Sequence, residues 1–174
     1  MTPGRREALI LGAIGAAAAG AGLLAGALAL QSRSGAAALL SATFPDLSGR
    51  SRRLAEWQGR ILVCNFWATW CAPCLEEMPM LAQLHEIHAP KGVEFVGISI
   101  DSAAKISEFI KKHPVGYPVL VAGIEAIDLM RALGNSAGSL PFTVVLDRPG
   151  NLGYRHLGIL SRQELEGVLA GLLR

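Results

Sequence analysis

The hydrophobic pattern of the chain begins with an uninterrupted apolar run near the N-terminus. Residues 8–30 comprise 10 Ala, 5 Gly and 8 Leu or Ile, with no polar or charged side chain. A helix of this length spans about 34 Å, enough to cross a hydrocarbon core of about 30 Å. Because Arg5 and Arg6 precede the run, we expect them to stay on the cytoplasmic side and the C-terminal part to lie outside.

Residues 1–30 are therefore interpreted as a transmembrane anchor or a cleaved signal peptide. The small residues of Ala27-Leu28-Ala29 suit a cleavage site. The Arg5-Arg6 pair before a weakly hydrophobic run also suits a twin-arginine signal. A buried helix of a soluble protein is the third interpretation, but no polar position marks a solvent-facing side. A lipid anchor on this segment is excluded because no Cys precedes Cys64.

Residues 31–42 are short, rich in Ser and Ala and without a clear periodicity, so they are interpreted as a linker. The folded domain is expected at residues 43–174.

Beyond residue 43, strand-like and helix-like patterns alternate. Residues 61–67 form an apolar run that is typical of a buried central strand. Residues 74–87 have helical periodicity, with Met78, Leu81 and Leu84 on one face. The other expected elements are strands at 44–49, 93–100 and 119–122, a turn or 3₁₀ segment at 54–57, and helices at 103–112 and 124–133.

The C-terminal part predicts a hairpin followed by a helix. Strands at 142–146 and 152–157 flank the turn residues 148–151. Ser161 and Glu164 form a capping-box pattern at the start of a helix that runs to residue 173. The whole order predicts an α/β sandwich with a central mixed sheet flanked by helices.

Composition narrows the function classes. The net charge is only +2, from 16 Lys and Arg against 14 Asp and Glu, so we expect no nucleic-acid partner. Hydrophobic residues make up 51% and charged residues 17% of the chain, which excludes a disordered protein. Three Cys residues exclude a scaffold held by several disulfides.

Candidate chemistry lies in the sequence Cys71-Ala72-Pro73-Cys74, which follows the buried strand and opens a helix. Backbone N–H groups and the helix dipole stabilise a thiolate at a helix N-terminus. Two intervening residues let the sulfurs meet in a small ring that can open and close. Pro73 is tolerated there because the first helical turn needs no N–H partner at that position. We therefore expect Cys71 to be the exposed nucleophile and Cys74 the more buried resolving thiol.

Two other interpretations of the pair are a fixed structural disulfide and a zinc site. Zinc would need two more ligands, and the chain offers only Cys64 and four scattered His residues. We expect no metal. We also expect Cys64 to be a small core residue rather than a third redox thiol.

The segment Asn65–Pro79 resembles the thioredoxin-like proteins of the TlpA/ResA group. The resemblance extends over roughly residues 44–174 and includes Leu140-Pro141-Phe142-Thr143. It implies a thioredoxin-like fold, usually tethered outside the cytoplasmic membrane. It also implies reduction or exchange of disulfides in exported proteins, including apocytochromes c and copper-site assembly factors.

The resemblance also implies where a substrate binds. Pro141 matches the family's cis-proline, which faces the Cys pair across the fold. Leu140 would then offer backbone groups to a substrate strand. Trp70, beside Cys71, is expected to form a contact surface, and Ala72 and Pro73 complete the expected substrate-binding set.

Asn65 departs from ordinary thioredoxins, which carry a buried Asp at the matching position. Because Asn cannot shuttle a proton, the nearest candidate is Glu77, three residues after Cys74 on the same helix face. ResA-like members have a Glu at this position. A partly buried carboxylate there would raise the pKa of the thiols.

The leading functional hypothesis is thus an exported thiol–disulfide oxidoreductase, acting as a reductase on the periplasmic side of a bacterial membrane. Expected partners are extracytoplasmic proteins with disulfides and a membrane electron donor, because the compartment itself is oxidising. No cofactor motif is present, so the redox-active group is the Cys71–Cys74 disulfide. The alternatives are a copper-binding assembly protein and a thiol peroxidase.

Overall fold

The computed structural model describes residues 4, 23, 26–27, 30 and 33–174. Most of the expected anchor or signal helix at residues 8–30 therefore lies outside the described residues. Within the part that is described, no helix combines the length and the hydrophobicity that a membrane crossing requires.

A five-stranded mixed sheet forms the centre of the domain, in the order β5-β4-β3-β6-β7. The strands are β3 (Ile61–Trp67), β4 (Val93–Ser99), β5 (Val119–Val121), β6 (Phe142–Leu146) and β7 (Leu152–Leu157). Strands β3, β4 and β5 are parallel, whereas β6 and β7 run antiparallel to their neighbours. Every residue of β3 is buried, as its apolar sequence predicts for a central strand. The α/β architecture with a mixed sheet is thus confirmed.

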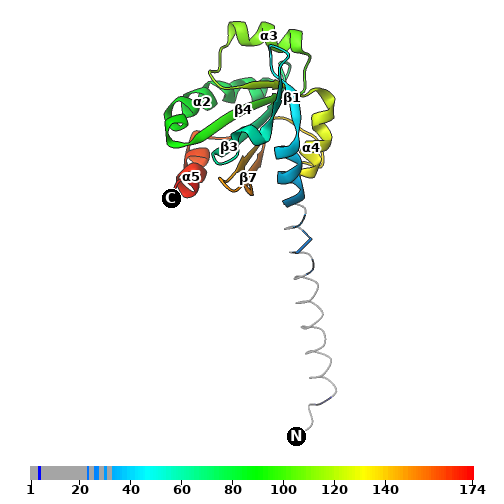
Figure 1. Cartoon of the computed structure of the whole chain (residues 1–174), viewed down its shortest axis with the longest axis vertical. Helices are drawn as coiled ribbons and strands as arrows, with labels where there is room; N and C mark the ends of the chain where they lie inside the picture. The colour runs from blue at the N-terminus through cyan, green and yellow to red at the C-terminus, as the bar shows by residue number, and fades with distance from the viewer. Residues whose placement is uncertain (1–3, 5–22, 24–25, 28–29, 31–32) are drawn as a thin grey trace. The chain divides into compact units, whose positions relative to one another are not determined.

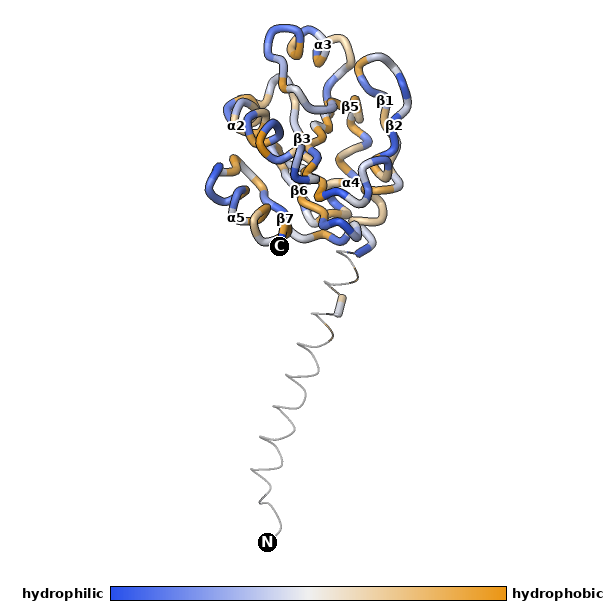
Figure 2. The backbone as a smooth tube through the Cα atoms, turned by 60° about the vertical axis from the view of Figure 1, so that its left-hand side comes forward, coloured by the Kyte–Doolittle hydropathy of each residue, from blue (hydrophilic) through white to orange (hydrophobic). Residues whose placement is uncertain are grey.

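Helices cover both faces of the sheet (Figure 1). One face packs against α2 (Ala72–His88), α3 (Ala103–Lys112) and α5 (Arg162–Leu172). The other face packs against α4 (Ala126–Ala132), the 3₁₀ segment η1 (Leu54–Trp57) and a helical segment at 33–41. In Figure 2, α5 changes between hydrophilic and hydrophobic colours along its turns, as an amphipathic helix does.

Strand β3 divides its side chains between two hydrophobic clusters. Val63 and Trp67 belong to the cluster under α2, together with Cys71 and Cys74. Cys64 belongs to the cluster on the opposite face of the sheet. It is fully buried and free, and burial raises the pKa of its thiol. The interpretation of Cys64 as a core residue is confirmed, and the sheet separates it from the other two sulfurs.

Small differences from the expected elements occur at their ends. The strand expected at 44–49 is a hairpin of β1 (Thr43–Pro45) and β2 (Ser51–Arg53). The Asp46 carboxylate closes its turn by accepting hydrogen bonds from the backbone N–H groups of Ser48 and Arg50. Strand β2 contains no apolar residue, so its sequence carries no strand pattern. Two short 3₁₀ segments, η2 (Ala89–Lys91) and η3 (Gly123–Glu125), complete the fold.

The expected linker at 31–42 needs correction, because residues 33–41 are helical. Ala36 and Leu39 are buried in the cluster that contains α4. Alanine has the highest helix propensity of all residues, and small side chains let two backbones approach closely. A composition that suggested an unstructured linker therefore produces a packed helical segment.

Gly35 provides a test of this packing. A Cβ atom at Gly35 would lie 2.4 Å from the carbonyl oxygen of Ala132 at the end of α4. We expect Gly35→Ala to lower the free energy of unfolding by about 1–3 kcal/mol, because overpacking against backbone forces a shift. The matched control is Gly167→Ala in α5, where a Cβ meets no atom within 4 Å. That change should stabilise the protein by up to about 1 kcal/mol. Urea denaturation measures both, and equal stabilisation by the two variants would contradict the packing of 33–41 on α4.

Candidate active site

The two cysteines lie where β3 gives way to α2. Cys71 is the N-cap residue of α2, and Pro73 lies in the first turn. A disulfide joins Cys71 to Cys74, with their Cα atoms 5.3 Å apart. The carbonyl oxygen of Cys71 accepts hydrogen bonds from the N–H groups of Cys74 and Leu75. The pair thus has the helix-start position that its spacing predicts.

Cys71 is more exposed than Cys74, as predicted, but the prediction that Cys71 is an exposed residue is wrong, because both cysteines are buried. Cys71 is only 6% exposed and Cys74 is fully buried. Both residues pack on the hydrophobic cluster under α2, and this packing limits the access of solvent to the disulfide. Trp70, by contrast, is 65% exposed beside Cys71. Ala72 is also exposed, and Pro73 is partly exposed.

The Leu140–Pro141 peptide bond is cis, as the resemblance implied. Pro141 immediately precedes β6, and Phe142 pairs with Phe66 near the end of β3. This register places Pro141 at the same end of the sheet as the loop that leads to Cys71. Pro141 is buried and Leu140 half-buried. The carbonyl oxygen of Pro141 accepts a hydrogen bond of 2.9 Å from the N–H of Gly158.

Glu77 is almost completely buried, with 2% of the residue exposed. The side-chain amide of Asn65 donates to its Oε1 over 2.7 Å. The backbone N–H of Leu160 donates to its Oε2 over 2.9 Å. Glu77 lies one turn beyond Cys74 on α2, where side chains three residues apart are neighbours. The carboxylate and the disulfide thus share one face of the helix.

Burial raises the pKa of Glu77 above its ordinary value, because a charged carboxylate loses its hydration inside the protein. The hydrogen bonds from Leu160 and Asn65 and the charge of His156 oppose this shift without cancelling it. A carboxyl group with a raised pKa exchanges its proton closer to neutral pH than an exposed one does. This property suits a group that accepts and returns protons.

Asn65 has a role that the sequence alone did not reveal. Its amide also donates to the hydroxyl of Thr143 over 3.0 Å, so both amide protons are used. Asn65 therefore holds the Glu77 carboxylate in place. The signal was present in its position, because Asn65 shares the side of β3 that carries Val63 and Trp67 toward α2.

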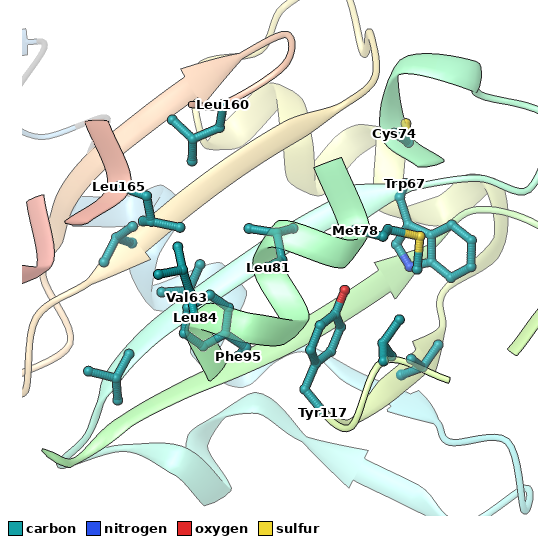
Figure 3. Close-up of a cluster of buried hydrophobic side chains, with 14 of the residues drawn as sticks. Val63, Trp67, Cys74, Met78, Leu81, Leu84, Phe95, Tyr117, Leu160 and Leu165 are labelled. Atoms are coloured by element: carbon teal, nitrogen blue, oxygen red, sulfur yellow. The ribbon is translucent and has the colours of Figure 1, made fainter. Parts of the chain in front are cut away.

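Gly97 lies beside Asn65 in the sheet and makes room for two large side chains. A Cβ there would be 3.1 Å from Nε1 of Trp67 and 3.2 Å from Cε2 of Tyr117. Figure 3 shows both rings in the hydrophobic cluster with Met78 and Cys74. Trp67 is thus part of the core that supports the site. Burial and the charge of Glu77 raise the pKa of Tyr117.

The loop before Cys71 is also tied to the neighbouring strand. The Thr69 hydroxyl donates to the Asp101 carboxylate, and the N–H of Ile100 donates to the carbonyl oxygen of Trp67 over 3.1 Å. Burial opposes ionisation of Asp101, but hydrogen bonds from Thr69 and Ser102 and the nearby Lys105 bring its pKa below the ordinary value. Its charge therefore persists at neutral pH and fixes the loop. No pattern of spacing along the chain indicates this contact.

No group of three or more His, Cys, Asp or Glu side chains in the described part of the chain is arranged to hold a metal ion. The chemistry that the described residues support is thiol–disulfide exchange with a carboxyl group as proton carrier.

Comparison with known proteins agrees with this geometry. Residues 33–170 match the Redoxin family. The chain is 31% identical over 126 residues to the thiol-disulfide oxidoreductase ResA of Bacillus cereus, covering 71% of this chain and 70% of the relative.

Two solved structures share the fold. A putative thiol:disulfide interchange protein DsbE from Chlorobium tepidum superposes with a TM-score of 0.69 at 21% identity, covering 76% of this chain and 93% of the other. A secreted disulfide oxidoreductase from Mycobacterium tuberculosis, homologous to E. coli DsbE, gives a TM-score of 0.65 at 26% identity, covering 76% and 97%. The fold is therefore thioredoxin-like, as the resemblance implied.

A disulfide at a helix start, a thioredoxin-like fold and a relative of matching sequence lead to one assignment. The chain belongs to the redoxin family and, within it, to the ResA-like thiol–disulfide oxidoreductases.

Proposed function

We propose that the protein is an exported reductase that transfers two electrons to disulfides of extracytoplasmic proteins. The observation that carries the proposal is the Cys71–Cys74 disulfide at the start of α2, one turn before the buried Glu77. Proteins of cytochrome c or copper-site maturation are the substrate class that the family resemblance suggests. A membrane electron donor of the thiol-reducing type would regenerate the dithiol.

In the first step the Cys71 thiolate attacks one sulfur of a substrate disulfide. A bond forms between Cys71 Sγ and that sulfur, and the other substrate sulfur leaves as a thiolate. The position of Cys71 at the helix N-terminus favours this role, since the backbone N–H groups and the dipole stabilise negative charge there. Trp70, Ala72, Pro73, Leu140 and Pro141 are the proposed substrate contacts.

In the second step Cys74 resolves the mixed disulfide. Its thiol must first lose a proton, which we assign to the Glu77 carboxylate. The Cys74 thiolate then attacks Cys71 Sγ, and the substrate sulfur leaves as a second thiolate. The substrate ends with two thiols, and the protein ends with the Cys71–Cys74 disulfide.

Export is supported by the apolar run at residues 8–30 behind Arg5 and Arg6. Residues 1–30 would serve as anchor or signal, and the helical segment at 33–41 would begin the folded domain, in place of a boundary at residue 43. A secreted oxidoreductase among the structurally similar proteins is consistent with this location.

The roles of the two cysteines can be separated with dithiobis(nitrobenzoate), a disulfide that releases one coloured thiolate in each step. The reduced wild type should give two releases, the first from attack by Cys71 and the second from resolution by Cys74. Cys74→Ala should give only the first release and retain the reagent on Cys71, as mass mapping would show. Faster modification of Cys74 than of Cys71 would reverse the assignment.

Glu77→Gln should slow the second release at least about tenfold, because positioned proton transfer contributes roughly 10²–10⁴-fold. It should also lower the apparent pKa of the thiols, since a nearby negative charge is removed. Because the pKa of Glu77 is raised, acidification should slow the second release of the wild type at a higher pH than it would if the base were an ordinary carboxyl group. Stopped-flow rates across pH measure these effects.

The control is Glu76→Gln, which changes the neighbouring carboxylate on a more exposed position of the helix and should leave the pH profile unaltered. Identical profiles for Glu77→Gln and the wild type would assign proton transfer to water.

A reporter fused to the C-terminus tests export. When the reporter is an enzyme that is active only outside the cytoplasm, the fusion should show its activity. Replacing Arg5 and Arg6 with neutral residues should reduce that activity. Activity confined to a cytoplasmic reporter would contradict export, while N-terminal sequencing of the mature protein distinguishes an anchor from a cleaved signal.

A further inference from the structure

Three backbone residues after β7 connect the parts of the active site. The N–H of Gly158 donates to the carbonyl oxygen of Pro141 over 2.9 Å. The N–H of Leu160 donates to Oε2 of Glu77 over 2.9 Å. The carbonyl oxygen of Ile159, between them, lies 3.2 Å from Nε2 of His156. The segment 158–160 is thus bonded to the cis-proline, to the buried carboxylate and to one histidine.

His156 stands on β7 among three titratable groups. Its Nδ1 lies 3.1 Å from the hydroxyl of Tyr154 on the same strand and 3.3 Å from Oε1 of Glu164 on α5. The Tyr154 hydroxyl donates to the same carboxylate over 2.5 Å. From α2, Glu77 interacts with the charge of His156. On β6, the residue opposite His156 is the uncharged Thr143.

Both ring nitrogens of His156 face hydrogen-bond acceptors. The Ile159 carbonyl and an ionised Glu164 carboxylate can accept hydrogen bonds but cannot donate them. A neutral imidazole has one N–H and can serve only one of them, whereas an imidazolium serves both. Burial and the neighbouring Glu164 raise the pKa of Tyr154 to about 12. Its hydroxyl therefore keeps its proton and remains a donor to Glu164.

We propose that His156 is a positioning residue whose second ring proton fixes the segment 158–160 and, through it, the Leu160 N–H that binds the Glu77 carboxylate. With the proton bound, Nε2 donates to Ile159 and Nδ1 to Glu164, and the positive charge favours the ionised carboxylate of Glu77. When that proton is lost, the ring can donate a hydrogen bond to only one of the two acceptors. The positive charge that favours ionised Glu77 is then also lost. The inference rests on the proposed function, because it gives the resolving step a second control by pH.

The sign of the effect follows from the charge. The positive charge of His156 lowers the pKa of Glu77 against the larger effect of burial. His156→Gln retains a donor for the Ile159 carbonyl but carries no charge, so we expect it to raise the pKa of Glu77 further. At acidic pH, where Glu77 is only partly ionised, the second release should then be about three times slower than in the wild type. The two rates should converge at alkaline pH, where Glu77 is ionised in both proteins.

The experiment combines a titration with kinetics on the full chain. Carbon NMR of the reduced protein, labelled at its glutamate carboxyl groups and assigned with Glu77→Gln, follows the Glu77 carboxyl directly. Glu164→Gln removes the negative acceptor that holds Nδ1, so it should change the titration of Glu77 as well. His88→Gln is the matched control, since His88 ends the helix that Cys71 begins. It should alter neither the titration nor the rates.

The outcomes separate this inference from the proposed function. If His156→Gln and the wild type titrate Glu77 identically, the positioning role of His156 is refuted while the thiol chemistry stands. If His156→Gln unfolds, Glu164→Gln alone decides, and an unchanged profile refutes the role. If the wild type gives no second release at any pH, the proposed function itself fails.

Discussion

The Glu77 carboxylate is the contact on which the arrangement of this domain depends. It accepts one hydrogen bond from Asn65 on the central strand and another from Leu160, which follows Glu77 by 83 residues in the chain. A carboxylate inside a protein is tolerated only when donors replace its lost hydration. The helix that carries the disulfide, the central strand and the loop after β7 must therefore keep their relative positions for the charge to be satisfied. The same carboxylate lies one turn beyond Cys74 on α2, so it ties the framework of the domain to the helix that carries the disulfide.

The order of the strands brings the parts of the active site together at one end of the sheet. Strand β3 ends beside Cys71, and β6 begins beside Pro141, because the two strands are antiparallel neighbours. The bond between Thr69 and Asp101 attaches the intervening loop to β4. Three neighbouring strands thus fix the cysteines and the cis-proline at one end of the sheet. Trp70, the residue before Cys71, remains exposed at that end.

Local patterns in the sequence were sufficient to predict elements that have a continuous apolar run or a single hydrophobic period. The strand 61–67, the helix 103–112 and the hairpin 142–157 follow directly from such patterns. The motif of Cys71 and Cys74 carries its own context, so their place at a helix start could also be predicted. The helical segment at 33–41 could not, because its buried face combines Gly35 and Ala36 with only one fully buried leucine, Leu39, which is too little to show a hydrophobic period. The hydrogen bonds of Glu77 with Asn65 and Leu160 could not be predicted either, because the spacing of residues along the chain does not indicate long-range hydrogen bonds.

The position of Cys64 has a consequence for how the chain becomes oxidised. Three cysteines allow three pairings in an unfolded chain, and an oxidising environment would favour any that forms first. In the folded domain the sheet stands between Cys64 and the other two sulfurs, so only the pairing of Cys71 with Cys74 is accessible. A premature bond to Cys64 would hold strand β3 away from its place in the core and block folding. The order of folding and oxidation therefore matters for this protein, and the sheet protects the correct pairing once it has assembled.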